Sequence, residues 1–216
     1  MIRKEKYLAK RENKEPLFTC EVTPHHLFLS TKDWERLGGV FGKMNPPLRG
    51  SHSIKALVNG LNDGTIDMVA SDHAPHLESE KGPDIRAAPS GVPGGVETLM
   101  PLMLAAVRKN ILPLAKMIML TSWNPARAFG LDLLGKGKLE VGYNADLMIV
   151  DPRNLQPVRA DMLHSKAGWT PPSKAWMRFF RNILCREARL SGWKNPLMQN
   201  PEEVNSLRQR KKVRRR

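Results

Sequence analysis

Four of the six histidines and one aspartate of this 216-residue chain lie directly after two short apolar runs. These residues are His25, His26, Asp72, His73 and His76. A carboxylate beside imidazoles can bind a divalent metal, transfer a proton, or do both. An isolated histidine more often has a hydrogen-bonded structural role. Two clusters at strand ends favour a shared site more than one histidine would, but their spacing alone leaves the structural role equally open.

Alternating strands and helices are expected to position these clusters. The apolar runs at residues 17–22 and 67–71 read as buried strands. Between them a helix is predicted that Ser51 or Ser53 would cap and that ends at residues 62–64. Such alternation is typical of a parallel α/β arrangement, in which strand ends meet at one rim. The pattern also predicts a short helix ending at residue 37, a short strand at 40–44, a binding loop at 77–95, helices at 97–109, 114–121 and 124–130, a strand at 147–151, and a basic helix at 178–190.

Composition excludes several classes of protein. The two cysteines, Cys20 and Cys185, lie far apart and in no metal-binding spacing, so a reduced setting without a disulfide framework is expected. No apolar run approaches 18 residues, and the charged N-terminus does not resemble a secretory signal. We therefore expect a cytoplasmic protein that does not span a membrane.

The net charge of +14 is unevenly distributed. Residues 208–216 contain seven basic side chains and no acid, so this tail carries half of the excess. Such a run can bind polyanions nonspecifically through counterion release, although a solvated terminus without specific function is the simpler interpretation. A nucleic-acid-binding function is disfavoured because no binding motif accompanies the charge.

Three motifs resemble those of the dihydroorotases in the amidohydrolase superfamily. They are Glu-Val-Thr-Pro-His-His-Leu at 21–27, Lys-Met-Asn-Pro-Pro-Leu-Arg at 43–49 and Ser-Asp-His-Ala-Pro-His at 71–76. The segment at 88–98 fits the same family, whereas 124–126 and 142–151 match amidohydrolases more widely. Related cyclic amidases such as allantoinase share parts of the pattern, so a hydantoin-like substrate stays an alternative.

The resemblance implies a role for each matched residue. His25 and Asp72 would bind zinc, and Asp72 would also act as general acid and base. The carboxylate of dihydroorotate would be held by Asn45 and His76. The backbone at Pro89, Ser90 and Gly91 would contact the pyrimidine ring. His26 and His73 are expected to support or pack, Arg49 to face the substrate or solvent, and Glu97 to cap its helix.

The resemblance further implies a partial enzyme with an α/β fold: the C-terminal part of a TIM-type (β/α)8 barrel, about strands six to eight, plus a remnant of the small β domain. The corresponding divisions are a charged segment at 1–16, a partial barrel at 17–135, the β remnant at 136–176 and a divergent basic tail at 177–216. The family's His-x-His motif, its bridging carboxylate or carbamylated lysine, and a further histidine have no counterpart in the sequence. A catalytic zinc normally has three protein ligands, so we expect the chain alone to bind zinc weakly and to be inactive. Two protein partners are considered. One is a complementary N-terminal half of the enzyme, and the other is aspartate transcarbamoylase, on which the chain would act as a noncatalytic scaffold.

Overall fold

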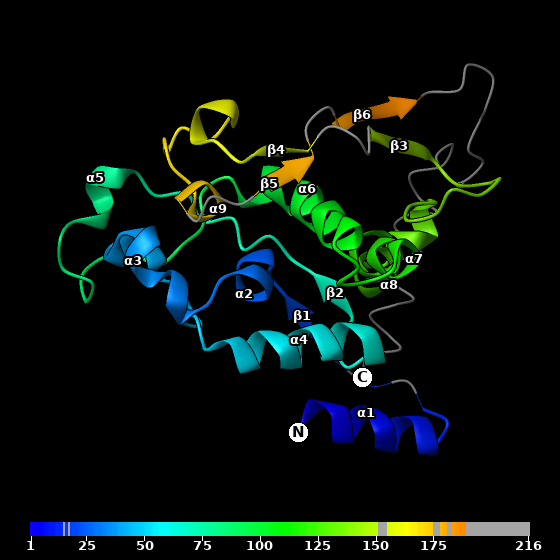
Figure 1. The fold of residues 1–216 in the computed structure, drawn as a ribbon. Helices are drawn as coiled ribbons and strands as arrows, with labels where there is room; N and C mark the ends of the chain where they lie inside the picture. Colours follow the sequence, from blue (N-terminus) through cyan, green and yellow to red (C-terminus); the bar gives the residue numbers. More distant parts are fainter. Residues whose placement is uncertain (15, 17, 151–154, 175–177, 181–182, 189–216) are drawn as a thin grey trace.

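The computed structural model describes residues 1–14, 16, 18–150, 155–174, 178–180 and 183–188. Helices predominate, and the strands are short (Figure 1). The α-helices are α1 (Ile2–Arg11), α2 (Pro24–Phe28), α3 (Trp34–Leu37), α4 (Ser51–Asp63), α5 (Glu78–Lys81), α6 (Gly95–Arg108), α7 (Leu114–Ile118), α8 (Asn124–Phe129) and α9 (Pro171–Lys174). The 3₁₀ segments are η1 (Thr31–Asp33), η2 (Gly39–Gly42), η4 (Asp132–Leu134) and η5 (Ala160–Met162), and η3 (Met119–Trp123) is a π-helix. The strands are β1 (Glu21–Val22), β2 (Met68–Val69), β3 (Ala145–Val150), β4 (Leu155–Pro157), β5 (Arg178–Phe180) and β6 (Ile183–Ala188).

A parallel strand pair lies at the centre of the fold. Strand β1 pairs with β2, with Glu21 opposite Met68 and Val22 opposite Val69. Helix α4 belongs to the crossover between them, as a parallel connection requires. It ends at Gly64, whose φ of 82° is the left-handed conformation that glycine adopts at low cost. The predicted strand–helix–strand unit is therefore confirmed.

The main hydrophobic core packs helices against this strand pair. Ten buried residues form it: Val22, Leu27, Leu61, Ile66, Val69, Met103, Ala106, Leu112, Met117 and Leu120. They come from β1, α2, α4, β2, α6, α7 and η3 and from the connections between them. Because both strands contribute a residue to this core, the position of their carboxyl ends is fixed by apolar packing.

The helices after β2 largely follow the sequence prediction. Helix α6 begins at Gly95, slightly before the expected start, and the predicted helix at 114–121 is observed as α7 followed by the π-helix η3. No break separates η3 from α8, so Asn124 does not cap a new helix. Its side-chain amide instead donates to the carbonyl oxygen of Asp67 at 2.6 Å, which ties this helix to the start of β2.

Two expectations about secondary structure are wrong. Residues Gly39–Gly42 form a 3₁₀ helix where a strand at 40–44 was expected; Gly38 and Gly39 both have positive φ, which turns the chain instead of extending it. Residues expected to form a basic helix at 178–190 contain β5 and β6, which pair antiparallel with β4 and β3. Pairing with an existing strand overrides the weak helical preference of this segment.

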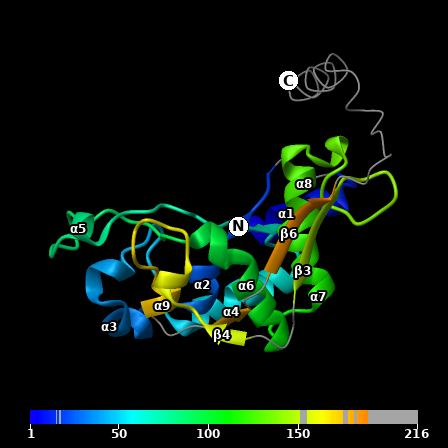
Figure 2. The same ribbon diagram turned by 90° about the horizontal axis from the view of Figure 1, so that it is seen from above.

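The two antiparallel pairs lie apart from the parallel one. Seen from above, β3 and β6 lie at the opposite end of the molecule from α3 and α5 (Figure 2).

In the part of the chain that the structure describes, no helix is both long enough and apolar enough to cross a membrane.

Candidate active site

His25 is positioned by the turn that follows β1. Thr23 begins α2, and its side-chain oxygen accepts from the backbone N–H of His26. Pro24 occupies the first turn, where its missing N–H costs no hydrogen bond. His25 is consequently held in the first turn of a helix whose core side is anchored by Leu27, and it is only 3% exposed.

The register of the strand pair brings Asp72 to His25. Each residue of β1 lies opposite the residue 47 positions later in β2, and His25 and Asp72 have the same separation. Both follow the last paired residue, Val22 or Val69, by three positions. The distance from His25 Nε2 to Asp72 Oδ2 is 3.6 Å. The two clusters identified in the sequence therefore meet, as predicted, at His25 and Asp72.

Asp72 has an unusual backbone for a residue with a side chain. Its φ is 48°, in the sparsely populated left-handed region, where strain is common at functional sites. Its side chain is 44% exposed, whereas that of His25 is almost fully buried. The carboxylate is therefore open to a ligand approaching from solvent.

The His25 imidazole is neutral and has a free ring nitrogen. Burial, together with a smaller effect of neighbouring His26, lowers the pKa of His25 from 6.5 to about 3. The buried Nε2 atom has no hydrogen-bond partner among the described residues. A neutral imidazole beside an accessible carboxylate is suited to binding a divalent metal. The described residues nevertheless contain no group of three or more candidate ligands.

His26 supports the loop that carries Asn45. Its Nδ1 lies 2.6 Å from the Thr23 hydroxyl and its Nε2 lies 2.8 Å from the carbonyl oxygen of Pro46. The Asn45–Pro46 peptide bond is cis, and the Asn45 side chain is exposed. The supporting role expected for His26 therefore agrees with its contacts.

The segment with His76 packs directly against Gly91. A Cβ atom at Gly91 would lie 2.4 Å from the carbonyl oxygen of Ala74 and 3.1 Å from the His76 ring. The Gly91 N–H in turn donates to the carbonyl oxygen of Lys43 at 3.4 Å, next to the Asn45 loop. Only glycine allows the three segments to approach this closely. The expected substrate-binding residues thus belong to loops in mutual contact.

Two residues beside these loops were missed by sequence reasoning. Lys81 donates to the carbonyl oxygen of Pro89 at 2.7 Å, and Trp169 donates through Nε1 to the carbonyl oxygen of His76 at 2.8 Å. In the sequence Lys81 lies between a glutamate-rich stretch and a glycine, and such polar surroundings give no sign that its side chain is buried. Glu97 also differs from expectation, because its carboxylate accepts from the backbone and ring nitrogens of His164 instead of capping α6.

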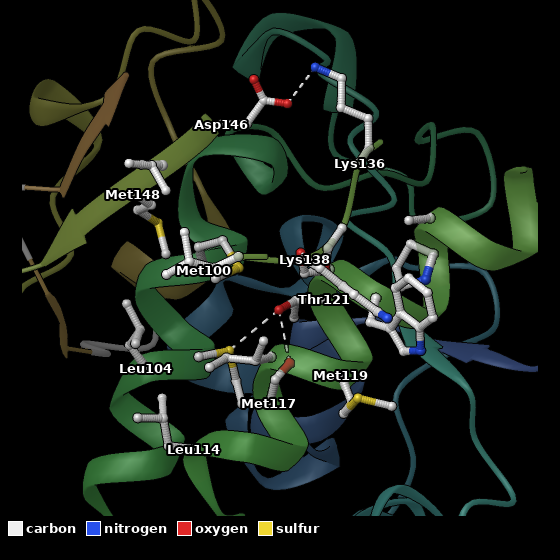
Figure 3. A pocket seen from close by; sticks show the side chains of 18 of the residues that line it. Met100, Leu104, Leu114, Met117, Met119, Thr121, Lys136, Lys138, Asp146 and Met148 are labelled. Carbon is white, nitrogen blue, oxygen red and sulfur yellow. Dashed lines mark hydrogen bonds and ion pairs between the residues drawn. The ribbon is translucent and has the colours of Figure 1, made fainter. Parts of the chain in front are cut away.

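A sizeable cavity lies elsewhere, and none of the predicted site residues lines it. It has a volume of about 1190 Å³ between α6, α7, η3 and β3, and its lining is rich in apolar side chains (Figure 3). Met100, Met117, Met119 and Met148 are among them. Two of its charged lining residues, Lys136 and Asp146, form an ion pair (Figure 3). This cavity is therefore separate from the candidate site at the ends of β1 and β2.

Comparison with known proteins identifies the family of this chain. The model of the amidohydrolase family matches residues 27–182. The chain belongs to the amidohydrolase family. Similar solved amidohydrolase folds include a dihydropyrimidinase from Brevibacillus agri NCHU1002, with 25% identity and a TM-score of 0.73 over 87% of this chain and 41% of that chain. An L-hydantoinase from Arthrobacter aurescens has 28% identity and a TM-score of 0.71 over 87% and 43%. The fold is accordingly of the TIM-barrel amidohydrolase type.

Curated amidohydrolase relatives are far more similar in sequence. A dihydroorotase of Methanosarcina mazei is 97% identical over 171 residues, which are 79% of this chain and 37% of that protein. A dihydroorotase of Halobacterium salinarum is 51% identical over 153 residues, 71% of this chain and 35% of that protein. The resemblance to dihydroorotases is thereby confirmed. The chain spans little more than a third of the length of these relatives.

Proposed function

We propose that this chain contributes part of a dihydroorotase active site, which reversibly hydrolyses dihydroorotate to N-carbamoyl-aspartate in pyrimidine biosynthesis. One observation carries the proposal: the unpartnered Nε2 of buried His25 faces the exposed carboxylate of Asp72 at 3.6 Å. The 97% identity to a dihydroorotase supports this substrate over others. We further propose the cytoplasm as its location.

Zinc is the metal that His25 and Asp72 would hold. A neutral imidazole and a carboxylate both suit zinc, and their free atoms point toward one another. A zinc ion bound there supplies Lewis acidity and lowers the pKa of a water molecule toward neutrality. Because catalytic zinc normally has three protein ligands, the remaining ligands would come from outside the described residues.

Asp72 would transfer the proton during ring opening. Its carboxylate is accessible, and it can accept a proton as water adds to the ring amide and return that proton to the leaving nitrogen. Asn45 and His76 can both donate hydrogen bonds to the substrate carboxylate. The backbone at Pro89, Ser90 and Gly91 would contact the ring, since these residues border the His76 segment.

We also propose that the chain corresponds to the C-terminal portion of such an enzyme, about strands six to eight of the barrel. The proposed divisions are residues 1–16, 17–135, 136–176 and 177–216. A barrel closes only with all of its strands, and the described residues contain a single parallel pair. We therefore expect no hydrolysis from this chain alone, and activity when a complementary N-terminal half is supplied.

Reconstitution tests the proposal. The chain is mixed with the part of Methanosarcina mazei dihydroorotase that it does not match, zinc is added, and N-carbamoyl-aspartate is quantified by chromatography. We expect turnover in the mixture, loss of at least a hundredfold with Asp72→Asn, and no loss with the exposed loop variant Asp84→Asn. Turnover that survives Asp72→Asn would contradict the assigned role.

Two alternatives have their own readouts in the same experiment. The similarity to a solved hydantoinase favours a hydantoin-type ring as second substrate class, as in cyclic amidases such as allantoinase. Turnover of hydantoins exceeding that of dihydroorotate would establish it. A noncatalytic scaffold would bind aspartate transcarbamoylase in a pull-down while the reconstituted mixture stayed inactive.

A further inference from the structure

Lys81 is a fully buried lysine at the end of α5. It is 1% exposed, and its Nζ donates to the carbonyl oxygen of Pro89 at 2.7 Å. Within the residues that the structure describes, no carboxylate lies within ion-pair distance of this ammonium group. Burial of the charge, together with nearby Lys43, lowers the pKa of Lys81. A buried cation without an acid is costly, so a specific contact must compensate for it.

Trp169 provides that contact from a distant part of the chain. The Lys81 Nζ lies 5.0 Å from the centre of the Trp169 ring, within the range of a cation–π interaction. Trp169 is itself 3% exposed, and its Nε1 donates to the carbonyl oxygen of His76 at 2.8 Å. The ring of Phe41 packs against it in an edge-to-face arrangement, with the two ring centroids 4.8 Å apart. One indole therefore contacts both the buried lysine and the His76 segment.

The two loops that these residues hold are the ones that pack at Gly91. Lys81 fixes the carbonyl oxygen of Pro89, two residues before Gly91, while Trp169 fixes that of His76. A methyl group at Gly91 would overlap the Ala74 carbonyl oxygen, so the two loops already lie as close together as their backbones allow at this point. An apolar residue in place of Lys81 would remove the side-chain donor of this part-buried hydrogen bond to the Pro89 oxygen.

We propose that Lys81 and Trp169 are a positioning pair that fixes residues 74–76 and 89–91 relative to one another for binding the anionic cyclic amide. This inference deepens the proposed function and rests on it for the substrate. Neither side chain needs to touch the substrate. Lys81 orients the segment that contacts the ring, and Trp169 transmits the same constraint to the segment that carries His76.

Hydrogen–deuterium exchange on the full chain tests the positioning directly. With Lys81→Met we expect exchange at least tenfold faster in peptides over both 73–77 and 89–92. Trp169→Phe keeps an aromatic ring but loses the indole N–H, so only 73–77 should accelerate. Lys43→Met is the matched control, because Lys43 Nζ donates to the carbonyl oxygen of Arg86 in the exposed part of the same loop. It should change neither peptide.

Exchange within twofold of the wild type in both peptides of Lys81→Met would overturn the proposal, as would equal acceleration by Lys43→Met. If Lys81→Met does not fold, Trp169→Phe alone decides, because a general loss of stability would not confine its effect to 73–77. Lys81→Arg retains a cation and donors and is expected to recover most of the protection.

Calorimetric titration of the reconstituted mixture with dihydroorotate separates the two proposals. We expect Lys81→Met to weaken dihydroorotate binding at least tenfold and zinc binding by less than twofold. An unchanged dihydroorotate Kd would refute the substrate-positioning role. If the wild-type mixture binds no dihydroorotate while the exchange pattern is as expected, the proposed function fails and the loop positioning stands.

Discussion

Replacing His25 by phenylalanine should remove a specific pH dependence of stability. The folded protein keeps this imidazole neutral because burial lowers its pKa from 6.5 to about 3, whereas the unfolded chain takes up the proton near pH 6.5. Between these values only the unfolded state is protonated, so stability falls as the pH falls. Each pH unit corresponds to about 1.4 kcal/mol, which gives a loss of about 3 kcal/mol between pH 7 and pH 4.

Urea unfolding followed by tryptophan fluorescence measures this difference in metal-free buffer at several pH values from 7 to 4. We expect the free energy of unfolding of the wild type to fall more steeply than that of His25→Phe, which retains a buried ring but cannot be protonated. Other groups, such as Asp33 with its lowered pKa, affect both proteins equally and cancel in the comparison. Parallel pH profiles for the two proteins would show that His25 is not buried in its neutral form.

Three further predictions follow from contacts of other residues. Gly91→Ala should lower the free energy of unfolding by about 2–4 kcal/mol, since its Cβ would lie 2.4 Å from a backbone oxygen. In Gly64→Ala the new Cβ meets no neighbouring atom, so this variant should lose only about 1–2 kcal/mol. Equal losses for the two variants in urea unfolding would contradict this. Asp67→Ala should cost about 1–3 kcal/mol, because Asp67 accepts from the Cys20 N–H at 2.7 Å and pairs with Lys6, and its thermal unfolding should show a lower midpoint. Deleting 208–216 should abolish any retention on heparin at low salt while leaving unfolding unchanged; retention that persists would place polyanion binding elsewhere.

The sequence was sufficient for the part of the fold that builds the candidate metal site. Two apolar runs, each ending in polar residues, predicted strands whose carboxyl ends meet, and β1 and β2 pair in parallel as expected. The distance between His25 and Asp72 follows from that pairing. These features are local in sequence, or depend on one strand register, and such features leave a pattern in the chain.

Features that depend on distant partners left no such pattern. The charged surroundings of Lys81 suggested exposure, but Trp169 from 88 residues later covers it. The basic segment after residue 177 suggested a helix, yet β6 finds its partner in β3. Glu97 stands where a helix cap is common, but His164 provides two donors. In each case a tertiary contact outweighs the local preference.

The equal spacing of His25 and Asp72 beyond their strands has a consequence for how this protein can vary. An insertion within the crossover from 51 to 66 lengthens the connection between the strands. It leaves each side chain three positions beyond the last paired residue of its strand, so His25 and Asp72 still meet. A single insertion between Val22 and His25 would move the imidazole around its helix and away from the carboxylate. Natural or engineered variants should therefore tolerate length changes in the crossover, while the segments 22–25 and 69–72 keep a fixed length.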